Sequence, residues 1–205
     1  MLTVALSKGR LLKDFIKFID ENGNSKWADA LNNRERKLQI EVANVRFILV
    51  KGNDVSTYVE EGIADIGITG SDILDEKDKL NVNNLVDLPF GYCHFAVASK
   101  PEVTEYKKIA TTYVKTTKAY FKNKGQDVSI IPLSGSVELA AVVNMVDAIV
   151  DIVQTGTTLK SNGLVEKESI GDINAKLITN KHAFFSKSNM IESFIEEIGV
   201  SMNAI

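Results

Sequence analysis

The segment richest in chemistry is Ala148–Leu159, in which an apolar run carrying an acid leads into a small polar turn. A glycine in such a turn lets the backbone approach a ligand closely, and N–H groups and hydroxyls at the start of a helix are donors for an anion. The acid can accept hydrogen bonds from sugar hydroxyls, so the segment predicts a sugar-phosphate site. The alternative is a capped strand–turn–helix, because Thr and Gly are common at caps. The candidate residues are Asp151, Thr155, Gly156, Thr157 and Thr158.

Basic residues follow the first apolar run of the chain, at Ser7–Arg10. Lys8, Arg10 and the free N–H groups of a helix that starts here converge on one point and suit a pyrophosphate. The alternative is a pair of solvated charges, although basic residues at a helix start oppose its dipole and an anion relieves that repulsion. Arg36 and Lys51 stand at the ends of two further predicted strands, and by residue type alone each is more typical of a surface charge.

Two other polar turns end predicted strands. Gly70 and Asp72 belong to the first, which either lines a base or ribose pocket or is a tight turn with Ser71 as helix N-cap. In the second, Ser136 is typical of an N-cap and Glu138 of a first-turn acid. The second turn therefore favours a structural role by itself.

The sequence lacks the signature motifs of several classes of protein. There is no G-x-x-x-x-G-K-[ST] loop, no G-x-G-x-x-G fingerprint and no G-x-S-x-G elbow. Cys93 is the only cysteine, and the two histidines, His94 and His182, lie far apart, which excludes a Cys/His metal cluster and disfavours a Ser/His/Asp triad. We expect no metal held by protein side chains.

The bulk composition indicates a globular cytoplasmic protein. Hydrophobic residues make up 44% and charged residues 25% of 205, enough apolar material for a real core. The net charge of −3, without a basic stripe, argues against nucleic acid. No run approaches the roughly 20 apolar residues of a membrane span, and the first residues do not form a signal peptide. A single cysteine fits a reducing compartment.

Short apolar runs alternate with amphipathic patterns and predict an α/β fold with mostly parallel strands. The predicted helices are Arg10–Asn22, Val55–Gly62, Tyr113–Lys124, Val137–Val143, Met190–Ile198 and a turn of helix ending near Asn162-Gly163. The predicted strands are Leu2–Leu6, Leu38–Val42, Val45–Val50, Asp65–Thr69, Asn84–Leu88, His94–Ser99, Lys108–Thr111, Val128–Leu133, Ala148–Val153 and Ala175–Thr179.

Pro89-Phe90-Gly91 breaks the pattern near the middle of the chain and divides it into two lobes. We predict lobe I over residues 1–90, with residues 178–205 returning to it. Residues 91–177 form lobe II, which carries the phosphate loop. Two α/β lobes with a cleft between them suit ligand capture at the carboxyl ends of strands.

Four stretches of the chain match a known family in order and nearly end to end. Through these stretches the chain resembles the short form of ATP phosphoribosyltransferase, the first enzyme of histidine biosynthesis. The resemblance implies a two-lobed fold like a type II periplasmic binding protein. The stretches are Leu2–Arg10, Asp54–Gly70, Lys108–Tyr113 and Ser134–Leu159.

The resemblance implies a role for each candidate residue. Asp151 and Thr155–Thr158 are expected to hold the ribose 5-phosphate end of phosphoribosyl pyrophosphate (PRPP), with Glu138 near the ribose. Gly70 and Asp72 are expected to belong to the ATP pocket. Lys51 stands where the family more often has Arg, and Asn144 and Val146 stand where it usually has Gly and a small residue. The residues expected to face the pyrophosphate of PRPP and the ATP phosphates are Lys8, Arg10, Arg36 and Lys51.

The reaction implied by the resemblance is attack of adenine N1 of ATP on C1 of PRPP, giving N1-(5-phosphoribosyl)-ATP and pyrophosphate. Mg²⁺ is expected to arrive bound to PRPP and ATP. The short form implies a hetero-oligomer with a histidyl-tRNA-synthetase-like regulatory subunit. Two alternatives stay open: a sensing module with the same two-lobed fold that binds an anion and catalyses nothing, and a phosphoribosyltransferase that acts on a free base.

Overall fold

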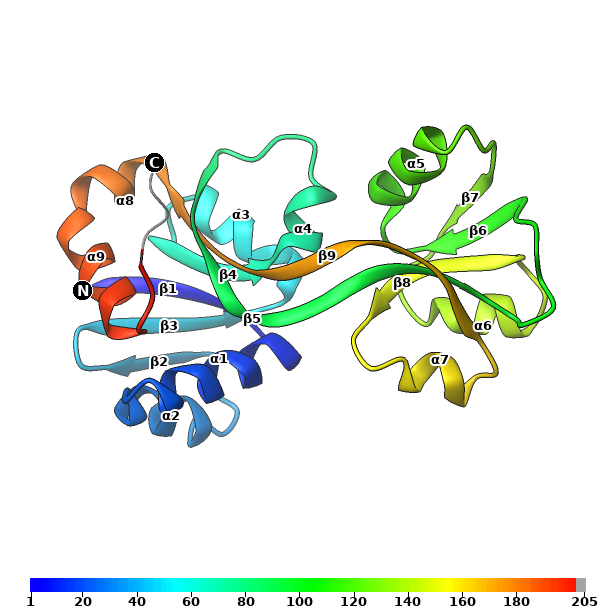
Figure 1. Cartoon of the computed structure of the whole chain (residues 1–205). Coiled ribbons are helices and arrows are strands. Elements are labelled where there is room, and N and C mark those ends of the chain that lie inside the picture. Colours follow the sequence, from blue (N-terminus) through cyan, green and yellow to red (C-terminus); the bar gives the residue numbers. More distant parts are fainter. Residues whose placement is uncertain (202–205) are drawn as a thin grey trace. The chain divides into compact units, whose positions relative to one another are not determined.

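The structure, a computed structural model, describes residues 1–201 and divides into two compact units (Figure 1). Unit 1 contains Met1–Gly91 and the chain from Asn174 onward, and unit 2 is Tyr92–Ile173. The sequence placed the second crossing at residue 178. In the structure the chain returns to unit 1 at Asn174. The boundary falls inside the continuous strand β9, where hydrophobic periodicity gives no signal, so the sequence could not locate it.

Unit 1 is built on a sheet whose central strands are parallel. Strands β1 (Leu2–Ser7), β3 (Val45–Val50) and β4 (Ile66–Gly70) run parallel, with β1 in the middle. The short β2 (Gln39–Val42) pairs antiparallel with β3, and β9 (Val165–Asn180) pairs antiparallel with β4. The order is β2-β3-β1-β4-β9. The predicted α/β class with parallel strands is confirmed.

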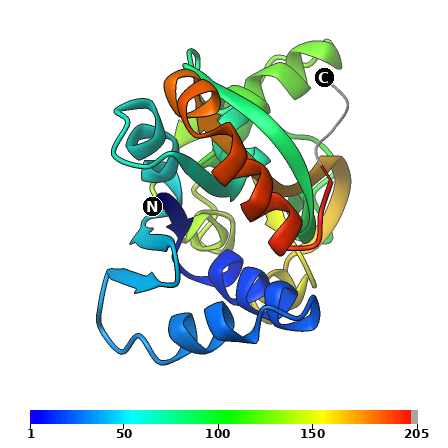
Figure 2. The same ribbon diagram turned by 90° about the vertical axis from the view of Figure 1, so that its left-hand side faces the viewer.

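The main core of unit 1 contains a group of packed aromatic rings. Trp27 stacks on Phe194 with ring centroids 5.2 Å apart and meets Phe47 edge-on at 5.6 Å. These rings join α2 (Ser25–Asn32) and α9 (Ser188–Glu197) to the sheet, and Phe15 of α1 (Arg10–Glu21) packs on Phe47 in the same buried cluster. Figure 2 views unit 1 from its end, with α9 in red and α1 and α2 in blue. The remaining helices of this unit are η1 (Gly52–Asp54), α3 (Val55–Glu60), α4 (Ser71–Asp75) and α8 (Lys181–Ser186).

Unit 2 repeats the plan on a smaller scale. Strands β6 (Lys108–Thr111), β7 (Ser129–Pro132) and β8 (Ala148–Val153) are parallel, and β5 (Val82–Ser99) pairs antiparallel with β8. β7 forms the edge, because the order of strands ends β5-β8-β6-β7. Each parallel strand is followed by a helix: α5 (Val114–Asn123), α6 (Val137–Val142) or α7 (Thr157–Ser161).

The structure corrects the sequence at the predicted break. Pro89 and Gly91 lie inside the single strand β5, where the sequence predicted two separate strands. Proline removes one N–H but keeps an extended φ, and Gly91 absorbs the irregularity with a φ of +72°. β9 likewise begins at Val165, ten residues before the predicted start at Ala175. The sequence missed this first half because its residues are largely polar. Within the described residues, no helix is both long and apolar enough to cross a membrane.

Candidate functional site

The carboxyl ends of the parallel strands in unit 2 bring three polar segments to one edge of the sheet. Thr112-Tyr113 follows β6, Leu133–Ser136 follows β7, and Gln154–Gly156 follows β8. The strand order β8-β6-β7 makes these ends neighbours. Ligands of open α/β sheets bind at this edge, so the predicted phosphate loop stands where the fold offers a site.

The loop at Thr155–Thr158 has a defined backbone. Gly156 is the N-cap of α7 with a φ of +70°, and a Cβ added to it would meet nothing within 4 Å. Glycine is therefore required for the conformation, and the space beside it is open. The Thr155 and Thr157 hydroxyl oxygens lie 3.0 Å apart, and the Thr157 N–H donates to Oγ1 of Thr155 at 3.5 Å. Thr155, Thr157 and Thr158 are exposed around this turn, which agrees with the predicted anion nest.

A Schellman motif closes the other end of α7. Gly163 has a φ of +70°, its N–H donates to the Lys160 carbonyl at 3.1 Å, and the Leu164 N–H donates to the Leu159 carbonyl at 2.9 Å. The predicted end at Asn162-Gly163 is confirmed. The loop is thus held between β8 and a firmly terminated helix.

Asp151 lies on β8, three residues before the turn begins, and is partly buried. Burial raises the pKa of Asp151 to about 6; the N–H of Ile152, donating to Oδ1 at 2.8 Å, opposes this rise, and the charge of Glu138 adds to it. The two predicted PRPP carboxylates, Asp151 and Glu138, are therefore close enough to repel each other. Hydroxyl donors placed between them relieve that repulsion, which suits a ribose diol.

The loop that enters α6 is strained. Gly135 has a φ of +156°, and Ser136 has a left-handed φ of +49°. Ser136 is the N-cap of α6, as predicted, but its side chain makes no capping hydrogen bond. A left-handed non-glycine residue costs about 1–3 kcal/mol, which the surrounding structure must offset. Glu138 lies in the first turn of α6, as predicted.

The structure explains why Asn can stand at position 144, where the family usually has Gly. Asn144 follows α6 with a φ of +59°, its N–H donates to the Ala141 carbonyl, and the Met145 N–H donates to the Ala140 carbonyl at 2.9 Å. This is the Schellman position that usually takes Gly, and Asn tolerates it best among the other residues. Lys100 Nζ donates to the Asn144 side-chain oxygen at 2.6 Å.

The basic candidates gather at the equivalent edge of unit 1. Lys8 follows β1, and its N–H donates to the Val50 carbonyl at 2.9 Å, which places it beside Lys51 at the end of β3. Arg10 begins α1, whose first turn has neither an acid nor a side-chain cap. Arg36 precedes β2, and the Leu49 N–H donates to the Leu38 carbonyl, so its loop lies beside the end of β3. The fold therefore brings the chain segments that carry all four cations to one edge of the unit 1 sheet.

Gly70 and Asp72 are placed together, for a reason that differs from the predicted one. Asp72 is buried in α4, and a Cβ on Gly70 would lie 2.0 Å from its Oδ1. Gly70 is thus required by the Asp72 carboxylate folded over it. The N-cap of α4 is Gly70, so Ser71 as N-cap is wrong; the Ser71 hydroxyl accepts the Asn174 N–H at 3.4 Å.

The structure contains a threonine network at the unit 2 edge that the sequence patterns did not predict. Buried Thr117 donates to the Tyr113 carbonyl at 2.6 Å and lies 3.3 Å from the Thr111 hydroxyl, which in turn accepts the Tyr113 N–H at 2.9 Å. The Tyr113 ring packs edge-on against Phe95 at 4.9 Å. The only sequence signal was a run of small polar residues after a strand.

Comparison with known proteins assigns the family. A family model described as "HisG: ATP phosphoribosyltransferase" matches residues 51–199. A curated ATP phosphoribosyltransferase from Staphylococcus carnosus is 72% identical over 204 residues, covering 100% of both chains. The chain belongs to the ATP phosphoribosyltransferase family. This confirms the family and the enzyme class, a pentosyltransferase, that the sequence predicted.

Solved structures agree with the ATP phosphoribosyltransferase assignment. A structure described as the HisG:HisZ ATP phosphoribosyl transferase complex from Thermotoga maritima is 33% identical, has a TM-score of 0.78, and covers 97% of this chain and 96% of that one. A Candida albicans protein with the generic periplasmic binding protein fold is 17% identical with a TM-score of 0.60, covering 97% of this chain and 69% of that one. The second likeness bears on the fold alone and agrees with the predicted fold class.

Proposed function

We propose that this chain catalyses the first step of histidine biosynthesis, in which adenine N1 of ATP attacks C1 of PRPP and pyrophosphate leaves. The observation that carries the proposal is the juxtaposition in unit 2 of Asp151, Glu138 and the left-handed Gly156 loop, on a chain whose relative of 72% identity is an ATP phosphoribosyltransferase. An acid pair beside an anion nest matches the diol and 5-phosphate of one sugar phosphate.

The PRPP roles follow from the chemistry of these groups. The N–H groups at the start of α7 and the hydroxyls of Thr155, Thr157 and Thr158 bind the 5-phosphate. Asp151 and Glu138 accept hydrogen bonds from the ribose hydroxyls. Holding the sugar at both ends fixes C1 for in-line attack, and orientation of this kind lowers the barrier of a two-substrate reaction.

The leaving group is anionic, and the unit 1 edge supplies cations for it. Lys8, Arg10, Arg36 and Lys51 stabilise the pyrophosphate of PRPP and the phosphates of ATP as negative charge builds up. Gly70 and Asp72 belong to the ATP pocket in this proposal. Adenine N1 carries a free lone pair, so the reaction needs no general base.

Magnesium is proposed to come with the substrates. Within residues 1–201, no three His, Cys, Asp or Glu side chains are grouped closely enough to hold a metal ion. Asp151 and Glu138 are only two carboxylates, and in this proposal they accept hydrogen bonds from the ribose hydroxyls. PRPP and ATP phosphate oxygens are the ligands that Mg²⁺ prefers, and the bound ion supplies charge neutralisation on the pyrophosphate.

We also propose a regulatory partner and a cytoplasmic location. The Thermotoga maritima relative is described as a complex of HisG with HisZ. For this chain the proposed partner is a histidyl-tRNA-synthetase-like regulatory subunit in a hetero-oligomer. A biosynthetic enzyme that consumes ATP and PRPP fits the cytoplasm, where both substrates are made.

The direct test mixes the purified chain with ATP, PRPP and Mg²⁺, with and without the regulatory subunit, and follows phosphoribosyl-ATP by ultraviolet absorbance. Product is expected, and its dependence on the subunit shows whether the chain suffices. PRPP binding without product from ATP, but with product from a free base, would contradict the choice of acceptor. Absence of PRPP binding would favour the sensing module.

A further inference from the structure

The proposed phosphate loop is part of a segment that leaves the unit 2 sheet and returns to it. The chain leaves β8 after Val153 and enters β9 at Val165, so residues 154–164 carry the loop and α7 between two strands. The side-chain hydrogen bonds of the loop are internal, since Thr155 and Thr157 bond to each other. They fix the shape of the turn but not its position relative to the sheet.

Apolar packing anchors the later part of this segment. Leu159 and Leu164 are 6% and 2% exposed and belong to a core cluster of unit 2 that also contains Val153. None of residues 154–158 is buried. The half of the segment that is proposed to bind phosphate therefore relies on the contacts at the two ends of the segment.

His94 on β5 contacts the residues at both ends of the segment. Its backbone pairs with Val153, the residue before the segment, in the antiparallel ladder of β5 and β8. Its side chain reaches Glu166, the second residue of β9, with Nε2 2.8 Å from Oε1. One residue thus links the strand that leads into the segment with the strand that leads out of it. We call the contact between His94 and Glu166 the clasp.

The clasp has a defined hydrogen-bond direction. An ionised carboxylate only accepts, so His94 Nε2 carries the proton and Nδ1 is the nitrogen that gains or loses one. The hydrogen bond to Glu166 is therefore kept in both charge states of the imidazole. The two side chains are 26% and 36% exposed, and this partial shielding from water makes the contact stronger than a fully exposed pair.

The clasp also lies beside a proposed PRPP carboxylate. Asp151 pairs with Ala96 in the same ladder in which His94 pairs with Val153. Residues two apart on a strand share a face, so His94 and Asp151 are diagonal neighbours on one face, about 7–8 Å apart at the usual spacing of strands. The end of β8 carries both Asp151 and the loop, so a contact that fixes this end positions both.

We propose that His94 and Glu166 are positioning residues, which hold the phosphate loop in the orientation that binds the 5-phosphate of PRPP. The inference rests on the proposed function, because it takes PRPP as the ligand of the loop. Neither residue contacts the substrate in this account. Without the clasp the free loop adopts more orientations, and PRPP must order it on binding, which lowers the affinity. Bound substrates still react at the same rate, because the groups that contact them are unchanged.

The first experiment removes the carboxylate of the clasp. Glu166→Ala is expected to weaken PRPP binding about fivefold, the usual worth of one hydrogen bond, with kcat at saturating substrates and the KM for ATP unchanged. Charge alone predicts the opposite sign, because removal of an acid favours an anionic ligand. Calorimetric titration measures the PRPP affinity, and initial rates of phosphoribosyl-ATP formation measure kcat and KM. Equal or tighter PRPP binding, or a fall in kcat at saturation, would overturn the proposal.

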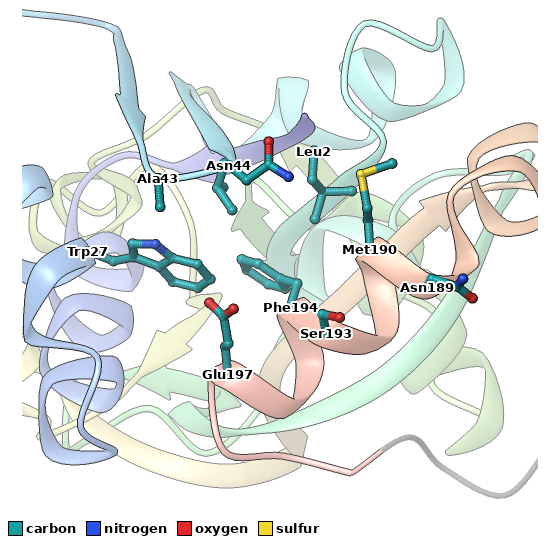
Figure 3. A pocket seen from close by; sticks show the side chains of 10 residues that line it. Leu2, Trp27, Ala43, Asn44, Asn189, Met190, Ser193, Phe194 and Glu197 are labelled. Atoms are coloured by element: carbon teal, nitrogen blue, oxygen red, sulfur yellow. The ribbon is translucent and has the colours of Figure 1, made fainter.

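A second acid serves as the control for charge. Glu197 is exposed at the end of α9 in unit 1, and Figure 3 shows it beside Trp27 and Phe194. Glu197→Ala removes the same charge as Glu166→Ala without touching the segment, so it is expected to bind PRPP as the natural chain does. A loss equal to that of Glu166→Ala would trace the effect to net charge and overturn the role of the clasp.

The donor is tested by two substitutions of His94. His94→Gln places an amide N–H close to the position of imidazole Nε2, so it is expected to keep most of the PRPP affinity. His94→Leu has no donor and is expected to match Glu166→Ala. Because both of these remove the same contact, the double variant should be no weaker than either single one. Equal affinities in His94→Gln and His94→Leu would show that the hydrogen bond does not matter and overturn the proposal.

Hydrogen exchange tests the clasp without any substrate. In the full chain, Glu166→Ala is expected to speed amide exchange in residues 154–164 about fivefold and to leave the rest of unit 2 unchanged. Lys167→Ala is the matched control, because it removes the neighbouring contact of β9, in which Lys167 Nζ donates to the Pro101 carbonyl at 2.7 Å. Faster exchange throughout unit 2 would show a general loss of stability and overturn the positioning role.

The two readouts separate this inference from the proposed function. A natural chain that does not bind PRPP would overturn the proposed function, and with it the PRPP role of the clasp, whatever the exchange rates are. A natural chain that binds PRPP, with unchanged affinity and exchange in Glu166→Ala, would overturn the clasp alone.

Discussion

Thr3 and Asp65 are joined by two hydrogen bonds. The Thr3 N–H donates to Oδ2 of Asp65 at 2.8 Å, and the Asp65 N–H donates to the Thr3 carbonyl at 2.9 Å. The same Oδ2 accepts a hydrogen bond from Lys187 Nζ at 2.8 Å. One buried carboxylate thus ties the start of β1 to the start of β4 and to the junction of α8 with α9.

Replacing this carboxylate should destabilise unit 1. Asp65→Asn keeps the shape but loses the charge that pairs with Lys187, and we expect the free energy of unfolding to fall by about 1–3 kcal/mol. Urea unfolding followed by Trp27 fluorescence measures it. Asp87→Asn is the control, because its ion pair with Lys176 at 2.6 Å is more exposed and is expected to be worth less than about 1 kcal/mol. Equal losses in the two variants would count against the role of Asp65.

PRPP affinity should depend on the ionisation of Asp151, because only the carboxylate accepts hydrogen bonds from both ribose hydroxyls. Burial raises the pKa of Asp151 to about 6, so affinity is expected to fall as the pH drops through that value. Asp151→Asn should bind PRPP more weakly at neutral pH and lack this step. The phosphates of PRPP titrate in both proteins, so the difference between the two profiles isolates Asp151.

The stability of the same variant gives an independent check. A raised pKa means that the folded state disfavours the ionised carboxyl, so Asp151 costs stability at neutral pH, and the cost disappears as pH falls from about 6 toward about 4. Asp151→Asn is therefore expected to resist urea better than the natural chain at neutral pH and equally well in acid. A constant difference at all pH values would contradict the assigned shift.

The phosphate loop is tested at Thr158. Thr158→Ala removes one hydroxyl donor at the start of α7 and is expected to weaken PRPP binding about tenfold. Ser161→Ala removes a hydroxyl from the far end of the same helix and should leave binding unchanged. Calorimetric titration with PRPP compares the two. Unaltered affinity in Thr158→Ala would remove Thr158 from the cradle.

Arg36 is proposed to act on the leaving group. Arg36→Ala should lower kcat by about 10²-fold, the usual cost of losing one stabilising donor, with a smaller change in PRPP affinity. Arg46→Ala is the control, because Arg46 is held in an exposed pair with Glu41 at 2.7 Å. Initial rates and PRPP titrations on both variants separate the two effects. A normal kcat in Arg36→Ala would end this assignment.

Asn144 should be replaceable by Gly but not by Ala. Ala at a left-handed φ is expected to cost about 1 kcal/mol of stability, whereas Gly adopts the conformation freely and offsets the lost contact with Lys100. Thermal unfolding of Asn144→Ala and Asn144→Gly measures the order. If Gly were the more damaging substitution, the hydrogen bond with Lys100 would outweigh the backbone conformation.

The sequence predicted the parallel cores of both units because their strands are continuous apolar runs, as in Ala148–Val153. It missed the start of β9 at Val165 and the short helices α2, α4 and α8, whose patterns span too few apolar positions to stand out. Boundaries inside β5 and β9 leave no compositional trace.

At the candidate site, residue types identified the groups but not their neighbours. Asp151 and Gly156 were predictable from an acid and a glycine placed around a strand end. The contact that makes Gly70 necessary, with the carboxylate of Asp72, depends on how one side chain folds over the backbone. The left-handed Ser136 is likewise a product of tertiary packing and has no local sequence signal.

Pro132 limits how the sheet of unit 2 can grow. The N–H groups of Ser129 and Leu133 donate toward β6, so the alternate positions, Ile130 and Pro132, face away from it. Proline has no N–H, which leaves Ile130 as the one outward donor on this four-residue edge. A strand from a neighbouring molecule finds a single N–H donor there, so this edge is a poor template for adding further strands.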